Sequence, residues 1–295
     1  FSDYINENTP DLIVLHGDRV EALAGAIVGS LNNILVAHIE GGEVSGTIDE
    51  FIRHSVSKLS HFHFVANLEA KKRLVQLGEN IDNIFEIGSP DIDIMFSNKL
   101  PNLEDVKLRY SINFKDYSIL MLHPVTTEIN LLQDYTKTLI KCLKDSNKKY
   151  IIILPNNDHG SQIIIDQYEQ LKNNSNFLIL PSMRFEYFLT LLKNANFIIG
   201  NSSAGIREAG YYNTPSINIG TRQKNRVKSK LIINCDFKEL EINNAIKNVY
   251  FLEKTESDIN FGSGNSAKKF LNILDKKHFF TNNIQKQFKD LQFVY

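Results

Sequence analysis

Three acidic side chains, Asp18, Glu40 and Glu50, stand where one fold type would bring them together. Asp18 follows the apolar run 12–15, and Glu40 follows the apolar run 34–39. Both runs are typical of buried parallel strands, whose carboxyl ends meet at the sheet edge where ligands bind. Carboxylates gathered there could take a proton from a substrate and return one to it. The sequence therefore predicts a functional site at this edge.

Glu50 lies near the start of a segment with a helical pattern, 48–59, and two roles are open to it. Thr47 followed three residues later by Glu50 is a capping-box pattern, so Glu50 could serve only to cap the helix. Arg53, about one turn further on, could contact a substrate or belong to a solvated face. The convergence of three carboxylates favours the functional role, as do two glycines at 41–42 that let the backbone approach a ligand closely.

The elements that must position these residues alternate between strand and helix. The segment 19–31 has apolar residues at helical spacing and joins the first two strands into a βαβ unit. The alternation continues to the polar stretch 98–117 and restarts beyond it. We predict an α/β protein with two Rossmann-like, doubly wound domains. They are an N-terminal domain over 1–100, a nucleotide-binding domain over 101–276, and a C-terminal helix over 277–295 that packs back on the first domain.

A second candidate site follows the strand 197–200. Ser202 and Ser203 come directly after this strand and precede a helical pattern, a point where backbone N–H groups and the helix dipole can hold phosphate. A plain serine N-cap explains the same residues. Glu208, beyond the first turn, could accept hydrogen bonds from ribose hydroxyls.

Two more segments of the second half carry polar residues at strand ends. His123 ends the first strand of this half, and a basic loop over 221–226 follows a later one. Arg222 and Arg226 in that loop could bind a diphosphate through paired hydrogen bonds. A solvated charged loop explains the two arginines equally well.

Composition argues against several classes of protein. The 33 basic and 34 acidic residues give a formal net charge of −1, which indicates no nucleic-acid-binding surface. No apolar run is long enough to span a bilayer, and no signal peptide is visible. Cys142 and Cys235 cannot build a disulfide framework, so we expect a cytoplasmic protein.

His61 and His63 share one strand face, but no acidic or Cys partner stands at ligand spacing, so we expect no metal.

Six motifs, taken together and in order, resemble one known family. They are HGDR at 16–19, HIEGGE at 38–43, DEFIRHSVSKLSH at 49–61, HP at 123–124, RFEYFLTLLKNANFIIGNSSAGIREA at 184–209 and GTRQKNR at 220–226. Over nearly the whole chain, they resemble the hydrolysing UDP-N-acetylglucosamine 2-epimerases of sialic acid biosynthesis. The resemblance implies two Rossmann-like domains in a glycosyltransferase-B-like arrangement, no cofactor, and a homo-oligomer that is a dimer or larger.

The resemblance also implies roles for individual residues. The residues that match the family's catalytic groups are Asp18, Glu40, Glu50 and His123, and those that match substrate-binding groups are Arg53, Ser202, Ser203, Glu208 and Arg222. Two departures from the family pattern stand out. An N-terminal strand with a Gly-Thr-Arg-like turn is absent here, so we expect the first domain to be incomplete. Asn225 stands where relatives usually have Gly.

The reaction that the resemblance implies is an elimination followed by a hydration. A carboxylate removes the C2 proton of UDP-N-acetylglucosamine as the anomeric diphosphate leaves, and 2-acetamidoglucal remains. Water then adds at C1 while a proton returns to the other face of C2, which releases N-acetylmannosamine and UDP. Three alternatives stay open: a hydrolysing 2-epimerase of a UDP- or GDP-linked 2,4-diacetamido-2,4,6-trideoxyhexose (legionaminic acid pathway), a glycosyltransferase of the same architecture, and a non-catalytic nucleotide-sugar-binding fragment.

Overall fold

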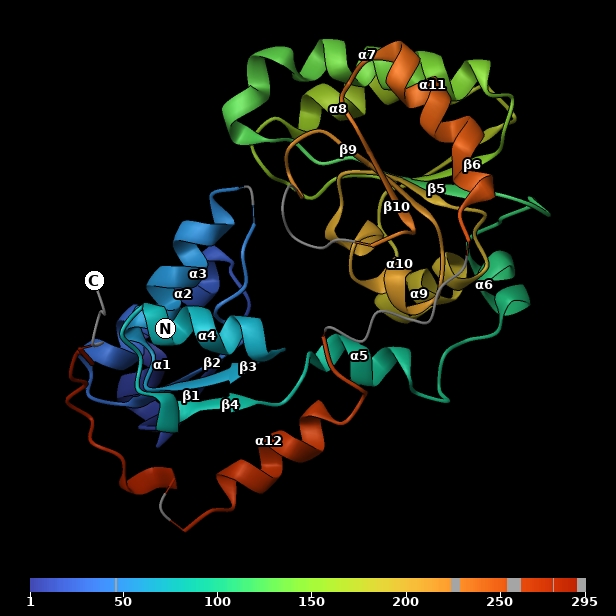
Figure 1. Cartoon of the computed structure of the whole chain (residues 1–295). Helices are drawn as coiled ribbons and strands as arrows, with labels where there is room; N and C mark the ends of the chain where they lie inside the picture. The colour runs from blue at the N-terminus through green and yellow to red at the C-terminus, as the bar shows by residue number, and fades with distance from the viewer. Residues whose placement is uncertain (46, 224–228, 254–260, 278, 291–295) are drawn as a thin grey trace. The chain divides into compact units, whose positions relative to one another are not determined.

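The protein forms two compact α/β units (Figure 1). The computed structural model describes residues 1–45, 47–223, 229–253, 261–277 and 279–290. The first unit comprises Phe1–Val44, Ile48–Ser97 and the described residues after 260, and the second comprises the described residues of Ser45–Thr47 and Asn98–Ile259. Each unit contains one sheet whose strands are all parallel. The predicted fold class, α/β with two Rossmann-like parts, is confirmed.

The first sheet has four parallel strands in the order β1-β2-β3-β4. Helices α2, α3 and α4 lie over one face and α12 over the other (Figure 1), which explains why β2 and β3 are almost wholly buried. Val56 of α3 packs with Leu15 and Val36 on one face, and Phe270 of α12 packs with Phe64 on the other. The elements of this unit are α1 (Ser2–Asn8), β1 (Leu12–His16), α2 (Val20–Leu31), β2 (Leu35–Ile39), α3 (Asp49–Leu59), β3 (Phe62–Val65), α4 (Leu68–Gln76), η1 (Ile81–Asn83), β4 (Ile84–Glu86), α5 (Pro90–Met95), α12 (Ser266–Leu274) and η6 (Phe279–Thr281).

The second sheet has six parallel strands in the order β10-β9-β8-β5-β6-β7. The chain enters at β5, runs outward to β7 and then returns to build the other side from β8, so the order reverses between β5 and β8. In open α/β sheets, such a reversal leaves a crevice at the carboxyl ends of the strands, where ligands bind. Helices α7, α8 and α11 lie over one face of this sheet and α9 and α10 over the other (Figure 1).

The elements of the second unit are short and follow one another with brief connections. They are α6 (Leu103–Arg109), β5 (Ser118–Met121), η2 (Thr126–Glu128), α7 (Ile129–Asp145), β6 (Tyr150–Ile153), α8 (Ser161–Tyr168), η3 (Glu169–Leu171), β7 (Phe177–Leu180), α9 (Phe185–Lys193), β8 (Ile198–Gly200), η4 (Ser203–Gly205), α10 (Glu208–Tyr211), β9 (Ser216–Ile219), β10 (Ile232–Cys235), α11 (Glu239–Asn248) and η5 (Val249–Phe251). One apolar core built from the strands, α7, α8 and α11 lies on one side of this sheet.

The C-terminal part differs from the helix predicted over 277–295. In the described residues after α12, the short 3-10 turn η6 is the only helical element. Asn282 Oδ1 accepts a hydrogen bond from the Asn283 backbone N–H (3.1 Å), and Asn283 Oδ1 accepts one from the Gln285 N–H (2.9 Å). Such local bonds from asparagine side chains compete with the backbone bonds of a helix. Residues 282–290 therefore follow an irregular path.

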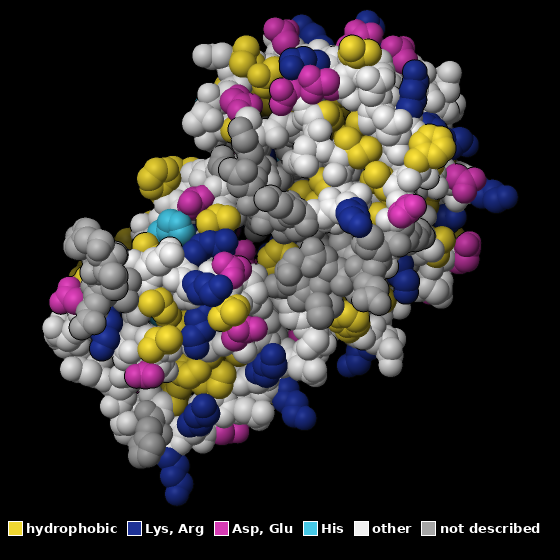
Figure 2. Space-filling view, viewed as in Figure 1, with side chains coloured by type: hydrophobic (Ala, Val, Ile, Leu, Met, Phe, Trp, Pro, Cys, Tyr) yellow, Lys and Arg dark blue, Asp and Glu magenta, His cyan; other side chains and the backbone are white. Residues whose placement is uncertain are grey.

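Surface charge is mixed, and His61 and His63 both hydrogen-bond to other groups of the protein. Acidic and basic side chains are interspersed on the face shown in Figure 2, in keeping with a net charge of −1. His63 hydrogen-bonds Glu79 (2.9 Å) and His61 hydrogen-bonds the Ile284 carbonyl (2.9 Å). Among the described residues, we find no group of three or more His, Cys, Asp or Glu side chains placed to hold a metal ion. No helix in this part of the chain is both long and apolar enough to cross a membrane.

Candidate active site

Asp18 and Glu40 lie at the same edge of the first sheet, which we call its carboxyl edge. β1 and β2 pair in parallel with His16 opposite Ile39, so both strands end together. The Gly17 N–H also donates to the Ile39 carbonyl (3.1 Å), which extends the pairing one residue beyond β1. The two acidic residues therefore leave the sheet from adjacent positions, as parallel strand ends require.

Arg53 of α3 connects this edge to the helix behind it. The Arg53 side chain is 3% exposed, and its Nη2 forms an ion pair with Asp18 Oδ2. Its Nη1 donates to the Glu43 carbonyl (3.1 Å). A guanidinium held at two points presents its donors in a fixed geometry. The structure thus gives Arg53 a role in orienting the Asp18 carboxylate, and its predicted contact with substrate stays a prediction.

The Glu40 side chain is held in a strained turn. Its backbone has a φ of 65°, a left-handed conformation that is uncommon for a residue with a Cβ and that tends to occur at functional sites. Glu40 is only 8% exposed, and its Oε2 lies 3.3 Å from Nε2 of His16. The strain turns the chain sharply after β2 and keeps this carboxylate at the carboxyl edge.

The start of α3 differs from the predicted capping box. The helix begins at Asp49 with Ile48 at the N-cap position, so Thr47 lies outside it and Glu50 is in the first turn. Glu50 Oε1 lies 3.5 Å from Nε2 of His54, one turn along. The assigned helix thus starts one residue later than the Thr-Glu spacing indicates, and the capping role of Thr47 stays a prediction.

Asp49 is an acidic residue that sequence reasoning missed. It precedes Arg53 by four residues, so the two side chains share one face of α3, and Arg53 on that face reaches Asp18. Glu50 is rotated about 100° around the helix from this face. The signal was visible in the sequence as the i, i+4 spacing of Asp49 and Arg53. The first turn of α3 therefore offers two candidate carboxylates rather than one.

A second missed residue, His38, connects three elements beneath the site. His38 is fully buried; its Nε2 lies 2.9 Å from the Gly17 carbonyl and its Nδ1 lies 3.0 Å from Ser57 Oγ. Desolvation lowers the pKa of His38 to about 3, although the Gly17 bond acts against it. The imidazole is therefore neutral, with Nε2 donating to the carbonyl and Nδ1 accepting from the serine hydroxyl. A Cβ at Gly41 would lie 2.8 Å from both Nδ1 and Oγ, so this pair requires a glycine there.

The turn after Glu40 packs against the start of α4. A Cβ at Gly42 would lie 2.3 Å from the Ala70 carbonyl oxygen, and Gly42 has a φ of 77°, so only glycine fits. Glu43 is 6% exposed, and its Oε1 accepts a hydrogen bond from Asn67 Nδ2 (3.3 Å). Glu43 is thus a further buried acid at this edge, within the HIEGGE motif but not selected from the sequence.

In the second unit, His123 lies at the reversal point between β5 and β8. Its backbone N–H donates to Asn201 Oδ1 (2.7 Å), and Asn201 Nδ2 donates to the His123 carbonyl (2.8 Å). A Cβ at Gly200 would lie 2.0 Å from the Met121 carbonyl oxygen, so β8 approaches β5 at a point where only glycine fits. The paired amide bonds fix the backbone that carries His123. Asn201 is a positioning residue that sequence reasoning missed.

The serines after β8 initiate a 3-10 turn rather than the expected α-helix. Ser202 occupies the N-cap position of η4, and its Oγ accepts a hydrogen bond from the Ala204 N–H (3.3 Å). Ser203 is the first residue of that turn, and Glu208, 6% exposed, is the first residue of the separate helix α10. The capping role of Ser202 is therefore present, and phosphate binding by this segment stays a prediction.

The loop after β9 lies over the end of β8. Arg222 Nη1 and Gln223 Nε2 both donate to the Asn201 carbonyl (3.2 and 3.1 Å). Arg222 is thus held close to Ser202, whereas Arg226 and Asn225 lie outside the described residues.

The structure assembles two groups of the predicted site residues. The first unit holds Asp18, Glu40, Glu50 and Arg53, and the second holds His123, Ser202, Ser203, Glu208 and Arg222.

Known proteins resemble this chain over most of its length. The family model for UDP-N-acetylglucosamine 2-epimerase matches residues 1–275. A UDP-N-acetylglucosamine 2-epimerase of Neisseria meningitidis serogroup B is 50% identical over 289 residues, which cover 97% of this chain and 76% of that protein. A UDP-N,N'-diacetylbacillosamine 2-epimerase (hydrolyzing) of Legionella pneumophila is 32% identical over 275 residues, which cover 93% of this chain and 73% of that protein.

A solved structure shares the fold. The crystal structure of UDP-GlcNAc 2-epimerase from Methanocaldococcus jannaschii in complex with UDP-GlcNAc and UDP superposes with a TM-score of 0.79 at 22% identity, and the match covers 92% of this chain and 78% of that one. At this identity the likeness establishes the fold alone. The family model and the Neisseria relative go further, and together they show that the chain belongs to the UDP-N-acetylglucosamine 2-epimerase family.

Proposed function

We propose that this protein is a hydrolysing UDP-N-acetylglucosamine 2-epimerase, which converts UDP-N-acetylglucosamine and water to N-acetylmannosamine and UDP for the synthesis of sialic acid-type sugars. The observation that carries the proposal is the carboxyl edge of the first sheet, where Arg53 orients Asp18 beside the strand end that bears Glu40. Inversion at C2 needs one group to remove a proton and another to return one, and this edge supplies several carboxylates.

The first half of the reaction is an elimination. A carboxylate of the first unit takes the C2 proton, the C1–O bond to the diphosphate breaks, and a double bond forms between C1 and C2. The negative charge of the departing UDP is stabilised by donors of the second unit, for which Ser202, Ser203 and Arg222 are the candidates. We assign Glu208 to the ribose and His123 to the diphosphate or the sugar.

The second half is a hydration of the 2-acetamidoglucal that remains. Water adds its oxygen to C1, a protonated side chain delivers a proton to the face of C2 opposite the one that lost it, and the proton that water loses restores that side chain. The atoms balance, because one water is consumed and no oxidant or reductant takes part. Asp18, Glu40 and a first-turn carboxylate of α3 share the two proton transfers, with Glu50 the predicted group and Asp49 added by its place beside Arg53.

Hydrolysis, rather than reversible epimerisation of the intact nucleotide sugar, is supported by the motifs and by the Legionella relative, whose name includes "hydrolyzing". The same relative's substrate keeps a 2,4-diacetamido-trideoxyhexose open as an alternative. We further propose a homodimer or larger assembly, which the family resemblance supports. We also propose a cytoplasmic location, which the free cysteines Cys142 and Cys235 support.

Turnover in heavy water tests the reaction class. An epimerase that works by elimination places deuterium at C2 of the released N-acetylmannosamine and liberates UDP in equal amount. A glycosyltransferase would leave C2 unlabelled and would need an acceptor, and a binding module would bind UDP without turnover. Parallel incubation with the UDP- and GDP-linked diacetamido sugars identifies the substrate; a faster reaction with one of them would replace UDP-N-acetylglucosamine in the proposal.

A further inference from the structure

The C-terminal residues 282–289, which we call the strap, lie along the amino edge of the first sheet, opposite the candidate active site. The Ile284 carbonyl hydrogen-bonds His61 Nε2 (2.9 Å), just before β3. The Lys289 N–H donates to the Gly78 carbonyl (3.2 Å), just after α4. Immediately before the strap, Phe279 stacks on Phe62 of β3 with ring centroids 4.0 Å apart. The strap thus crosses the points where α3 and α4 return to the sheet.

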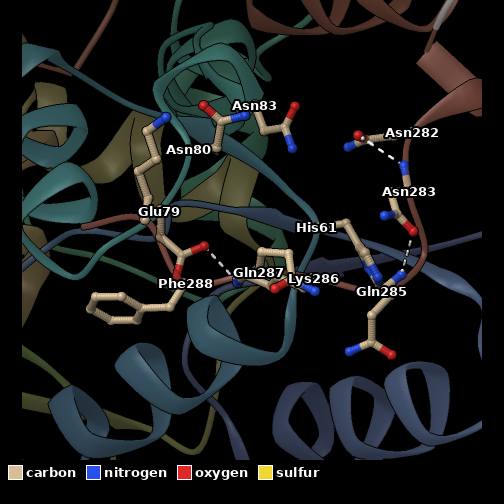
Figure 3. Close-up of a pocket in the computed structure, with 11 residues that line it drawn as sticks. His61, Glu79, Asn80, Asn83, Asn282, Asn283, Gln285, Lys286, Gln287 and Phe288 are labelled. Atoms are coloured by element: carbon tan, nitrogen blue, oxygen red, sulfur yellow. Dashed lines mark hydrogen bonds and ion pairs between the residues drawn. The ribbon is translucent and has the colours of Figure 1, made fainter. Parts of the chain in front are cut away.

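Lys286 is the strap residue that reaches deepest into this edge (Figure 3). Its Nζ donates to the carbonyls of Ser57 (3.2 Å), Lys58 (2.8 Å) and Ser60 (2.7 Å), where α3 ends. The last carbonyls of a helix have no partner within it and carry partial negative charge, so a lysine ammonium placed there satisfies and stabilises the helix end. A residue more than 220 positions away in sequence therefore caps α3.

A buried carboxylate holds the same ammonium in place. Glu79 is 2% exposed; its Oε2 lies 2.5 Å from Lys286 Nζ and 2.9 Å from His63 Nε2, and its Oε1 lies 2.9 Å from Lys58 Nζ. Burial by itself would raise the pKa of Glu79, but the hydrogen bond from His63 and the ammonium of Lys286 lower it to about 2. Glu79 is therefore ionised, and it needs its cations because a buried charge without partners is costly.

Polar side chains surround this part of the strap. A cavity of about 280 Å³ separates it from the body of the unit, and the amide side chains that line it are those of Asn80, Asn83, Asn282, Asn283, Gln285 and Gln287 (Figure 3). Of the strap residues, Ile284 and Phe288 are largely exposed. The strap therefore contacts α3 through the hydrogen bonds of Lys286 and through the Phe288 ring, whose centroid lies 4.8 Å from Lys58 Nζ.

The end of α3 that Lys286 caps is connected to the candidate active site in two ways. Four to seven residues before the capped carbonyls, the same helix carries Arg53, which orients Asp18. Ser57 also joins them directly, since its carbonyl accepts from Lys286 while its hydroxyl bonds His38, which in turn donates to the Gly17 carbonyl next to Asp18.

We propose that Lys286 is a positioning residue for catalysis: by capping α3 from the amino edge, it fixes the register in which Arg53 holds the Asp18 carboxylate. The effect on catalysis rests on the proposed function, whereas the effect of Lys286 on the order of α3 does not depend on that function. Loss of the cap lets α3 shift by fractions of an ångström, which misaligns the carboxylate more than it weakens nucleotide binding by the second unit.

Lys286→Met tests this, because methionine keeps an apolar stem and removes the charge and donors. We expect kcat to fall about tenfold with KM changed less than about twofold, and Lys286→Arg to recover most of the rate. Lys289→Met changes an exposed strap lysine and is the matched control; its kcat and KM should match those of the wild type.

A double variant tests whether Lys286 acts through Arg53. The fold-loss of kcat in the double variant Arg53→Lys, Lys286→Met should be smaller than the product of the two single fold-losses, because both residues act on one alignment. Multiplicative losses, or a Lys286→Met kcat at the wild-type level, would overturn the proposal.

Hydrogen exchange provides a readout that needs no substrate. Lys286→Met should speed amide exchange at both ends of α3, including residues 50–54, whereas Lys289→Met should not. Faster exchange confined to residues 57–60 would refute the positioning role even if the cap is real. An inactive wild-type protein with the predicted exchange pattern would refute the proposed reaction instead and leave the role of Lys286 in ordering α3 supported.

Discussion

Both edges of the first sheet carry carboxylates, but the carboxylates at the two edges serve different purposes. At the amino edge, the Glu79 side chain is 1% exposed and has three nitrogen atoms within 2.9 Å, so its charge is fully compensated. At the carboxyl edge, the Asp18 side chain is 27% exposed and has Arg53 as a partner, and Glu40 sits in a strained turn. Asp18 therefore remains accessible for proton exchange, whereas Glu79 is enclosed and holds elements together.

The sharpest test of this contrast is to neutralise one carboxylate at each edge. Glu40→Gln should reduce UDP release about 10³-fold, since it removes a group proposed to carry a proton in the reaction, while the unfolding midpoint in urea stays close to wild type. UDP binding by calorimetry checks that the second unit is intact. Turnover within tenfold of wild type would remove Glu40 from the mechanism and with it the proposed difference between the edges.

Glu79→Gln should mainly lower stability, with a loss of kcat no larger than the roughly tenfold expected for Lys286→Met, because it removes the partner that holds that ammonium. It leaves His63, Lys58 and Lys286 without their shared anion, and breaking a buried charge pair in this way costs about 3 kcal/mol of unfolding free energy. Denaturant unfolding measures the loss, and Glu69→Gln, which removes an exposed pair with Lys72, is the control expected to change little. If Glu79→Gln proves as stable as the control, the amino edge is not the structural anchor we describe.

His38 makes the stability of the first unit depend on pH. Its pKa is about 3 in the folded protein and near 6.5 when unfolded, so only the unfolded state gains this proton as the pH falls below 6.5. Stability contributed by neutral His38 is complete above 6.5 and is lost toward pH 3, at up to about 1.4 kcal/mol per pH unit. His38→Gln should flatten the dependence of unfolding free energy on pH by about one proton. An unchanged slope would show that His38 does not stay neutral in the folded protein.

The smallest effect that we expect is a difference in kcat between variants of the two acids in the first turn of α3. Asp49 shares the face of Arg53, and Glu50 is paired with His54, so Asp49→Asn should lower kcat about tenfold more than Glu50→Gln. Steady-state kinetics on both variants, prepared in parallel, decides between them. The opposite ranking would restore Glu50 as the proton carrier and place the functional face of α3 one residue further on.

The sequence predicts where the strands end, but it does not predict which partners the side chains there contact. The apolar runs before Asp18 and Glu40 indicate parallel strands, and parallel pairing alone puts their ends at one edge, so that part of the site follows from periodicity. The roles of His38 and Asn201 depend on partners far away in sequence, Gly17 and His123, which no local pattern specifies. The assigned start of α3 differs by one residue from the Thr-Glu spacing, which is within the usual variation of helix ends.

The amide of Asn201 has a consequence for the lifetime of the protein. One of its two terminal atoms accepts a hydrogen bond from the backbone of His123 and the other donates one back, so the orientation of the group is determined. Hydrolysis of that amide to a carboxylate exchanges the donating nitrogen for an oxygen and sets it against the His123 carbonyl at 2.8 Å, where two acceptors repel. A chemical change of a single atom during storage or ageing would thus loosen the crevice between β5 and β8 while leaving the rest of the sheet untouched.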